Sequence, residues 1–313
     1  MKIAFFEVKP DEKVFFTEAL KGHELSFFET TINDALQQSQ EYEIISVFVH
    51  SYINETVLDL LPNLRYIQTR STGYDHITCK EIYARGLTLS NVAGYAGPAV
   101  GEFAFSLLLN AIRHTHTAIS RSKEDNFVYE DLQGTELYAK TVGILGLGTI
   151  GERIAYIASG FGMNIMAWSR TRKPIVDKLQ IDFTDIDDLL ARSDVIMIAL
   201  PLNPTTKDLI NSENIHLLKP TAIIINIARA EIIEATLYAS IPNPLGLDFS
   251  ISTKATRNKQ ILHTPHMAYY TKEALIRIMN ISLENMLVFI EKQTLPNCLK
   301  LVCHQDYEQK KDA

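Results

Sequence analysis

The stretch that decides the fold is Thr141-Val142-Gly143-Ile144-Leu145, followed directly by Gly146-Leu147-Gly148-Thr149-Ile150-Gly151. An apolar run, a glycine-rich turn and the helix-compatible residues 152–159 predict a strand, a tight turn and a helix start. The first glycine permits the turn, the second lets backbone approach a pyrophosphate, and the third lets the helix pack on the strand. Free N–H groups and the positive end of the helix dipole then face the anion. Such turns also arise for packing alone, but the flanking strand and helix favour a dinucleotide site.

Composition bounds the remaining possibilities. The chain has 313 residues, of which 46% are hydrophobic and 21% charged, which is typical of globular protein with room for two domains. A net charge of −7 argues against a general nucleic-acid binder. Residues 1–8 resemble a buried strand rather than a signal peptide, and no apolar run approaches the roughly 18 residues of a membrane span.

The three cysteines, Cys79, Cys298 and Cys303, fit neither a disulfide framework nor a metal-binding pattern. We therefore expect a cytoplasmic protein with inert thiols, without a metal site and without a nucleic-acid or membrane partner.

Apolar strands alternate with helical stretches in two blocks. Strands are expected at Lys2–Val8, Leu25–Glu29, Ile44–His50, Tyr66–Arg70, Leu87–Val92, Thr141–Leu145, Asn164–Trp168, Val195–Leu200, Ala222–Asn226, Pro244–Asp248 and Gln260–His263. A strong breaker, Gly94–Pro98, precedes a long helix expected over Ala99–His114, and Thr184–Asp187 resembles a helix N-terminal cap. Strands that are apolar throughout and separated by helices imply parallel sheets covered on both faces.

The predicted fold class is therefore α/β, with two Rossmann-like or flavodoxin-like parallel-sheet domains separated by a cleft. Residues 98–269 would form the dinucleotide-binding Rossmann domain. A last helix over about Lys272–Lys292 would return the chain to the first block, so that residues 1–97 and 270–313 form a discontinuous substrate domain.

The residues after the second strand of a dinucleotide site distinguish NAD from NADP. There an acidic residue bonds the ribose 2′-hydroxyl of NAD, but this chain reads Ser169-Arg170-Thr171-Arg172-Lys173, with no acid. A hydroxyl and two guanidinium groups would hold a 2′-phosphate by charge-assisted hydrogen bonds. We expect NADP(H) to be preferred, with NAD(H) possible; the alternative is a basic surface loop.

Several motifs, in order along nearly the whole chain, resemble the D-isomer-specific 2-hydroxyacid dehydrogenases, the family of D-lactate dehydrogenase and glyoxylate/hydroxypyruvate reductase. They are Arg70–Ile77, Asn91–Tyr95 with Ala99–Ala104, the glycine turn, Leu200–Thr206, Asn226–Arg229, Gly246–Asp248 and Thr264–Ala268. The resemblance implies reduction of a small 2-oxo acid (of the glyoxylate, hydroxypyruvate or pyruvate type) to the D-2-hydroxy acid.

Two residues suit that chemistry on physical grounds. Arg229 follows a buried strand, and its guanidinium can bind a carboxylate through two parallel hydrogen bonds. The alternative is a structural arginine paired with a surface acid. His266 is a natural acid or base because imidazole titrates near neutral pH, although a lone histidine among apolar residues is more often a hydrogen-bonded core residue. The resemblance favours the catalytic interpretation of both.

The resemblance also implies further contacts. Substrate would meet the backbone N–H groups of Thr72 and Gly73, together with Tyr95 and Arg229; the alternative for Tyr95 is that it serves only in packing. Arg70 would brace the loop of Thr72 and Gly73 or form a surface salt bridge. Cofactor-binding residues would be Val100, Gly146, Gly148, Thr149, Ile150, Gly151, Ser169, Arg170, Thr171, Arg172, Leu200, Pro201, Thr206, Ile227, Ala228, Asp248 and His266. A homodimer is implied, formed through the cofactor domain and the helix after Pro98.

The chain departs from the family at two places. The glutamate that normally bonds the catalytic histidine is replaced by Thr253, so that imidazolium is less stabilised and the pH profile should shift downward or the rate fall. Ala230 stands where glycine usually follows the arginine, and would be strained by about 1 kcal/mol or more if a positive φ were needed there. These departures leave open an alternative, a dinucleotide-binding sensor or corepressor-like protein.

Overall fold

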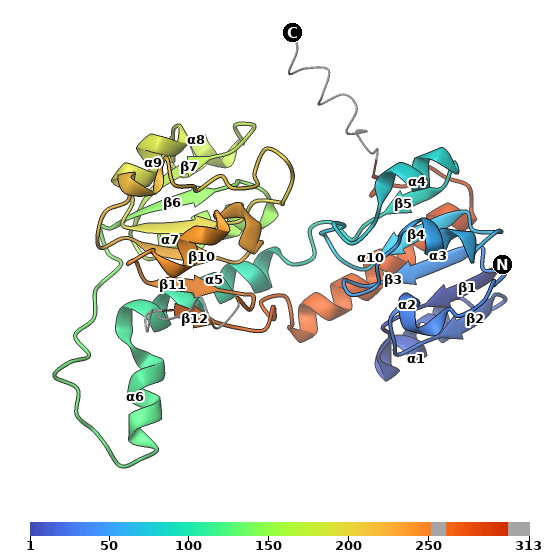
Figure 1. Cartoon of the computed structure of the whole chain (residues 1–313), viewed down its shortest axis with the longest axis horizontal. Helices are drawn as coiled ribbons and strands as arrows, with labels where there is room; N and C mark the ends of the chain where they lie inside the picture. Colours follow the sequence, from blue (N-terminus) through green and yellow to red (C-terminus); the bar gives the residue numbers. More distant parts are fainter. Residues whose placement is uncertain (252–260, 300–313) are drawn as a thin grey trace, which may run out of the picture. The chain divides into compact units, whose positions relative to one another are not determined.

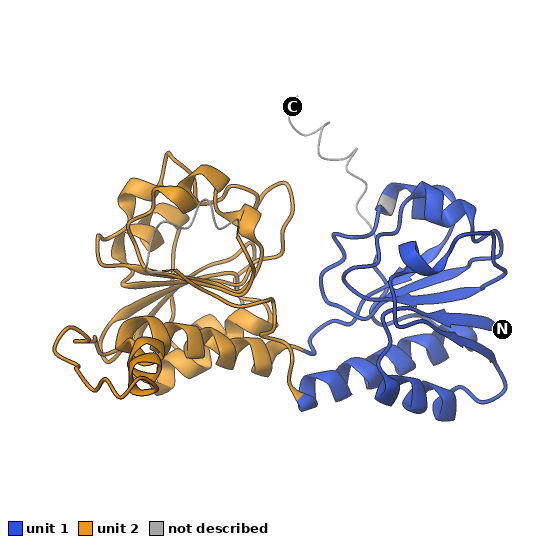
Figure 2. Ribbon diagram, turned by 60° about the horizontal axis from the view of Figure 1, so that its bottom comes forward, with its two compact units in different colours: residues 1–95, 272–313 blue, residues 96–271 orange. Residues whose placement is uncertain are grey.

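The computed structural model describes residues 1–251 and 261–299 (Figure 1). The chain divides into two compact units (Figure 2). Unit 1 contains Met1–Tyr95 and the chain from Lys272 onward, and unit 2 contains Ala96–Thr271. Each unit is built on its own wholly parallel sheet, which confirms the predicted α/β class with two parallel-sheet domains.

Unit 1 has a five-stranded sheet in the order β2-β1-β3-β4-β5. Its strands are β1 (Lys2–Phe5), β2 (Glu24–Phe27), β3 (Ile44–Val47), β4 (Tyr66–Thr69) and β5 (Thr88–Ser90). Its helices are α1 (Pro10–Ala19), α2 (Ile32–Ala35), α3 (Glu55–Asp59), α4 (Cys79–Ala84) and α10 (Lys272–Ile290). This is the flavodoxin-like order, in which the direction of winding reverses between β1 and β3.

The central strands β3 and β4 of unit 1 are buried along their whole length, whereas the edge strand β2 is partly exposed. Phe5 of β1 stacks on Phe16 of α1 and on Phe27 of β2, with ring centroids 4.6 and 5.0 Å apart. Helix α10 packs against α1 and β4, where Tyr66 stacks on Phe289 at 4.5 Å. The residues after Thr271 thus complete the core of unit 1.

Unit 2 has a seven-stranded sheet in the order β12-β11-β10-β9-β6-β7-β8. Its strands are β6 (Thr141–Leu145), β7 (Asn164–Trp168), β8 (Asp182–Phe183), β9 (Val195–Ile198), β10 (Ile223–Asn226), β11 (Leu245–Leu247) and β12 (Ile261–His263). Its helices are α5 (Gly97–Arg113), α6 (Thr115–Ser122), α7 (Thr149–Gly160), α8 (Ile175–Lys178) and α9 (Ile186–Arg192), with 3₁₀ helices at Ile215–Leu217, Ala230–Ile232 and Ala235–Ala239. This is the Rossmann order, and its reversal lies between β6 and β9, where α/β proteins bind ligands.

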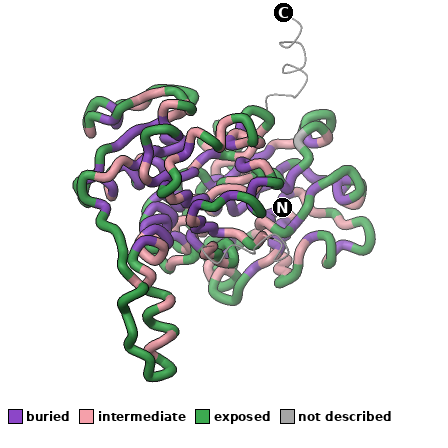
Figure 3. Tube along the Cα trace, turned by 60° about the vertical axis from the view of Figure 1, so that its left-hand side comes forward, coloured by how far each residue is buried: buried purple, intermediate pink, exposed green. Residues whose placement is uncertain are grey.

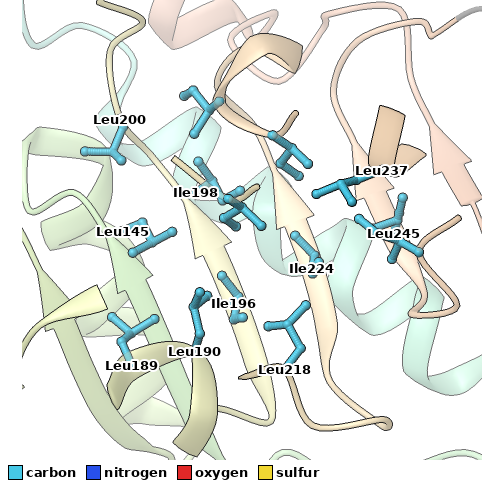
Figure 4. Close-up of a cluster of buried hydrophobic side chains, with 14 of the residues drawn as sticks. Leu145, Leu189, Leu190, Ile196, Ile198, Leu200, Leu218, Ile224, Leu237 and Leu245 are labelled. Carbon is cyan, nitrogen blue, oxygen red and sulfur yellow. The ribbon is translucent and has the colours of Figure 1, made fainter. Parts of the chain in front are cut away.

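One face of this sheet forms the core cluster drawn in Figure 4. Leu145, Ile196, Ile198 and Ile224 from three neighbouring strands are fully buried there. Burial of each such side chain contributes about 2 kcal/mol. Strands β6, β9 and β10 are therefore anchored in a buried core.

Residues 115–138, which we call the arm, differ from the rest of unit 2. The arm comprises α6, none of whose residues is buried, and an irregular segment that leads toward β6 (Figure 3). Three of its apolar side chains, Phe127, Val128 and Tyr129, are 75%, 57% and 73% exposed. The arm thus carries apolar surface that unit 2 itself does not cover.

Candidate active site

The three glycines after β6 have three different environments. Gly146 has a φ of +101°, and a Cβ there would lie 2.8 Å from the Ala199 carbonyl oxygen. A Cβ on Gly151 would lie 1.8 Å from the Gly146 oxygen, whereas a Cβ on Gly148 would meet nothing within 4 Å. The first glycine therefore makes the turn, the third permits packing, and only Gly148 borders open space.

Helix α7 begins at Thr149, directly after that open position. The backbone N–H groups of Thr149, Ile150 and Gly151 lie in its first turn, where they have no partner within the helix. Together with the helix dipole they suit a pyrophosphate. The turn therefore fits a dinucleotide.

The segment after β7 lies beside this turn because the Gly146 N–H donates to the Trp168 carbonyl at 2.8 Å. Ser169 is partly buried, while Arg170 and Thr171 are exposed. Arg172 pairs with Asp177 at 2.6 Å, and its guanidinium carbon lies 5.7 Å from the Phe183 ring centroid. Arg172 therefore already has an anionic partner that any 2′-phosphate would have to share.

The loop after β9 is closed by one hydroxyl. Thr206, which is 5% exposed, donates to the Pro201 carbonyl at 2.6 Å and accepts from the Asn203 N–H at 2.9 Å. Leu200 lies against Gly146, since its side chain would be 2.9 Å from a Cβ built there. Leu200 thus borders the glycine turn, while Thr206 fixes the shape of the loop through Pro201.

Arg229 follows β10 in a turn that one asparagine organises. Asn226 is fully buried, donates from Nδ2 to the Arg229 carbonyl at 2.9 Å, and accepts from the Ala228 N–H at 2.9 Å. The Arg229 side chain is partly exposed, and its Nη1 donates to the Ala228 carbonyl at 3.1 Å. Ile227, which precedes this turn, is 7% exposed.

The backbone strain considered for Ala230 does not occur, because this residue does not need a positive φ. Ala230 starts a 3₁₀ helix and is not one of the residues with positive φ. Its carbonyl accepts a hydrogen bond from the Tyr238 hydroxyl at 2.8 Å. Burial raises the pKa of Tyr238, so this hydroxyl stays protonated as a donor. Alanine therefore replaces glycine here without backbone strain.

Asp248 lies directly after β11 and is 2% exposed. Its Oδ1 accepts from the Thr264 hydroxyl at 2.7 Å and from the Met267 N–H at 2.8 Å, and its Oδ2 accepts from the Ala268 N–H at 2.9 Å. These donors flank His266 on both sides. The carboxylate thus holds the segment that carries the histidine, a role that the sequence did not reveal.

His266 itself is exposed and has a φ of +52°. A non-glycine residue in this region stores roughly 1–3 kcal/mol of strain, which surrounding bonds must offset. The His266 N–H donates to the Thr264 carbonyl at 2.9 Å, and its ring meets the Tyr269 ring edge to face at 6.2 Å. Thr253, the position of the missing glutamate, lies outside the described residues.

The strand order places these groups at one edge of the sheet. Arg229, Asp248 and His266 follow β10, β11 and β12, which are neighbours in that order. The carboxyl ends of parallel strands meet at the same edge. A cation, a carboxylate and an imidazole therefore share the edge that also carries the glycine turn after β6.

The remaining predicted residues lie in unit 1, except Val100, which is buried in α5 of unit 2. Thr72 is exposed and Gly73 partly buried, in the loop after β4. Tyr95 is 5% exposed, and its carbonyl accepts from Arg277 Nε at 2.8 Å.

Arg70 forms an ion pair, with Glu12 at 3.5 Å, but the arginine is buried and the pair does not lie at the surface as the salt-bridge alternative supposed. Arg70 is 1% exposed, and its guanidinium donates to the carbonyls of Ser46, Phe6 and Glu7 at 3.2, 2.8 and 3.0 Å. Burial lowers the pKa of Arg70, while the charges of Glu12 and Glu7 act in the opposite direction. Arg70 therefore ties together the carboxyl ends of β1, β3 and β4.

Two broader features complete the site description. Within residues 1–251 and 261–299, no cluster of three or more His, Cys, Asp or Glu side chains is arranged to hold a metal ion. Among the helices that the structure describes, none is long and apolar enough to cross a membrane.

Fold and site together define a dinucleotide-binding α/β protein with a basic and an imidazole side chain at one sheet edge. Residues 105–268 match the family model described as D-isomer specific 2-hydroxyacid dehydrogenase, NAD binding domain. The chain belongs to the D-isomer-specific 2-hydroxyacid dehydrogenase family, and the residues that match the NAD-binding-domain model all lie within unit 2.

Relatives cover most of the chain. 2-Hydroxyacid dehydrogenase A of Aspergillus oryzae is 31% identical over 96% of this chain and 95% of its own length. Glyoxylate reductase of Pyrococcus horikoshii is 36% identical over 64% of this chain and 62% of its own length. The solved structure of D-lactate dehydrogenase from Aquifex aeolicus, complexed with NAD and lactic acid, is 26% identical, with a TM-score of 0.85 over 96% of this chain and 99% of that one.

Proposed function

We propose that this protein is an NADPH-preferring reductase that converts a small 2-oxo acid to the D-2-hydroxy acid. The observation that carries the proposal is the placement of Arg229, Asp248 and His266 after three neighbouring strands of the sheet that holds the glycine turn. Glyoxylate, hydroxypyruvate and pyruvate are the proposed substrate types.

The cofactor assignment follows from the first turn of α7 and the segment after β7. Gly146, Gly148, Thr149, Ile150 and Gly151 would hold the pyrophosphate. Ser169, Arg170 and Thr171 would meet the 2′-phosphate, with Arg172 shared between that phosphate and Asp177. The remaining walls would be Val100, Leu200, Pro201, Thr206, Ile227, Ala228 and Asp248.

The chain's own residues then have separate tasks. A bound reduced nicotinamide supplies the hydride. Arg229 grips the substrate carboxylate and polarises the ketone, since a guanidinium stabilises the charge that develops on oxygen. His266 gives its proton to that oxygen as general acid. Asp248 keeps the His266 segment in place through its three hydrogen bonds.

Unit 1 is the proposed substrate unit. Its loop after β4 would offer the N–H groups of Thr72 and Gly73 to the carboxylate, and Tyr95 would approach the substrate. The protein would act as a homodimer, which the exposed apolar side chains of the arm support.

The competing proposal, a dinucleotide-binding sensor, rests on the replacement of the glutamate by Thr253. Arg229 and His266 favour the enzyme because a pure binder needs neither. A substrate panel distinguishes the two. Purified protein is assayed with glyoxylate, hydroxypyruvate, pyruvate and phenylpyruvate, with NADPH and NADH, at several pH values.

We expect turnover, and we expect His266→Gln to lower kcat by about 100-fold or more without changing the Kd for NADPH. His263→Gln is the matched control, because His263 is an exposed histidine three residues earlier. No turnover with any of the four acids would favour the sensor.

A further inference from the structure

The loop after β4 presents two backbone donors whose orientation needs an explanation. Thr72 is exposed and Gly73 partly buried. In the part of the chain that the structure describes, neither the Thr72 N–H nor the Gly73 N–H donates to a protein acceptor. These are the two N–H groups proposed above to hold the substrate carboxylate. A carboxylate site works only if such donors are held in one direction in advance.

Residues just after β5 fix the orientation of these two N–H groups by bonding the carbonyls of the same peptides. The Val92 N–H donates to the Ser71 carbonyl at 3.0 Å, and Asn91 Nδ2 donates to the Thr72 carbonyl at 2.8 Å. In a planar trans peptide the C=O and the following N–H point to opposite sides. The bonded carbonyls of Ser71 and Thr72 therefore turn the N–H groups of Thr72 and Gly73 away from β5.

Other bonds in the loop do not replace the one from Asn91. The Thr72 hydroxyl donates to the Val92 carbonyl at 2.9 Å, and the Ser71 hydroxyl donates to the Gly73 carbonyl at 2.6 Å. These bonds fix the Thr72 side chain and the peptide after Gly73. The peptide between Thr72 and Gly73 is held by the Asn91 amide.

Asn91 is in turn held by the C-terminal helix. It is 7% exposed, and its carbonyl accepts from Asn285 Nδ2 of α10 at 3.0 Å. Asn285 is fully buried, and its Oδ1 accepts from Asn297 Nδ2 at 3.0 Å. The Asn91 N–H donates to the Asn297 carbonyl at 3.4 Å. Because these amides are buried, water competes little for their bonds.

We propose that Asn91 is a positioning residue of the substrate-carboxylate site, anchored to α10 by Asn285. The inference rests on the proposed function, since it assigns a role at the carboxylate that a 2-oxo acid would bring. Asn91 acts through the Thr72–Gly73 peptide and does not itself touch substrate. Helix α10 thereby contributes to substrate binding through two buried amides.

The test compares Asn91→Ala and Asn91→Leu with the wild type. Leucine is close to asparagine in size, so it keeps the site filled but cannot donate to the Thr72 carbonyl. Both variants should raise the KM for glyoxylate and the inhibition constant of oxamate, a carboxylate-bearing substrate analogue, by about tenfold to a hundredfold. The Kd for NADPH should not change, and kcat should change less than KM, because the lost contact binds substrate and transition state alike.

The control is Gln68→Leu, which removes another buried amide of unit 1. Gln68 is fully buried and donates from Nε2 to the Ser282 carbonyl of α10 at 3.1 Å, outside the carboxylate loop. It should lower the melting temperature without changing the oxamate constant. Asn285→Leu should raise that constant in the same direction as the Asn91 variants, but less.

Three results would count against these proposals, but they would not all overturn the same one. Wild-type turnover together with Asn91 variants that stay within twofold of the wild type for oxamate would overturn the role of Asn91 and leave the proposed function intact. An equal effect of Gln68→Leu would overturn it too, because the change would then be one of stability. A wild type that reduces no 2-oxo acid and binds no oxamate would overturn the proposed function, and this inference with it.

Discussion

At the scale of single residues, the proposed preference for NADPH over NADH rests on the charge just after β7. Ser169 is partly buried beside the glycine turn, and residues 169–173 hold no carboxylate. Ser169→Asp should repel a 2′-phosphate and offer an acceptor to a 2′-hydroxyl. We expect the ratio of kcat/KM for NADPH to that for NADH to fall about tenfold or more, measured with one 2-oxo acid.

A second substitution in the same segment should act in the opposite direction. Asp177 holds the Arg172 guanidinium at 2.6 Å, so Asp177→Asn should free that charge for a 2′-phosphate. The same ratio should then rise. If Ser169→Asp left the ratio unchanged, the assignment of this segment to the cofactor would be wrong, whatever Asp177→Asn does.

The sequence predicted residues whose chemistry is evident from their type, but not the residues that hold them. The glycines, Arg229 and His266 carry their own signal. The bonds of Asp248 to Thr264, Met267 and Ala268 span about 20 residues of chain. The bond between Asn91 and Thr72 spans 19 residues, and the one between Asn91 and Asn285 spans 194. Such contacts depend on the tertiary fold, so no local sequence pattern predicts them.

At the scale of elements, Asp194 joins the amino ends of three strands in unit 2. Its carboxylate accepts from Lys219 Nζ and from the Thr141 N–H, both at 2.8 Å, in front of β10 and at the start of β6. Burial acts to raise the pKa of Asp194, but these two donors outweigh it and leave the pKa below its usual value of 3.8. A lowered pKa in the folded state means stability that is present above pH 3.8 and is lost as pH falls through the folded-state pKa.

Asp194→Asn should therefore lower the free energy of unfolding at pH 7 by about 1–2 kcal/mol, and the difference should vanish at strongly acidic pH. Denaturant unfolding of both proteins across that range measures it. Asp187→Asn is the control, an exposed acid in the first turn of α9, and should change stability by about 0.5 kcal/mol or less. A difference that persisted in acid would mean that the Asp194 charge is not its source.

The ends of the strands and helices are predicted less well from sequence periodicity than the elements themselves. The strands predicted at Lys2–Val8 and Ile44–His50 end at Phe5 and Val47, because the apolar pattern continues into the loops that follow. Glu7 has a φ of +56°, which ends β1. Strand β8 has only two residues and was not predicted. By contrast, the long helix predicted over Ala99–His114 is α5, which ends at Arg113 because His114 adopts a φ of +51°.

At the scale of the whole molecule, the arm is the feature that a single chain does not explain. Its side chains Ile119, Phe127, Val128 and Tyr129 are each more than half exposed. Contiguous exposed apolar surface of this kind marks an interface, and the homodimer proposed for this protein supplies a partner of matching chemistry. In a twofold-symmetric dimer one patch is buried twice, so weakening it should have a large effect.

The double substitution Phe127→Ser with Tyr129→Ser should therefore convert the dimer to a monomer. Size-exclusion chromatography with light scattering should give the mass of two chains for the wild type and of one chain for the variant. The variant should keep its circular dichroism spectrum, because neither side chain contributes to the core of unit 2. Val14→Ser is the control, since Val14 is 66% exposed on α1 of unit 1 and should leave the mass unchanged. A monomeric wild type would refute the dimer, and a dimeric variant would place the interface elsewhere than on these two aromatic side chains.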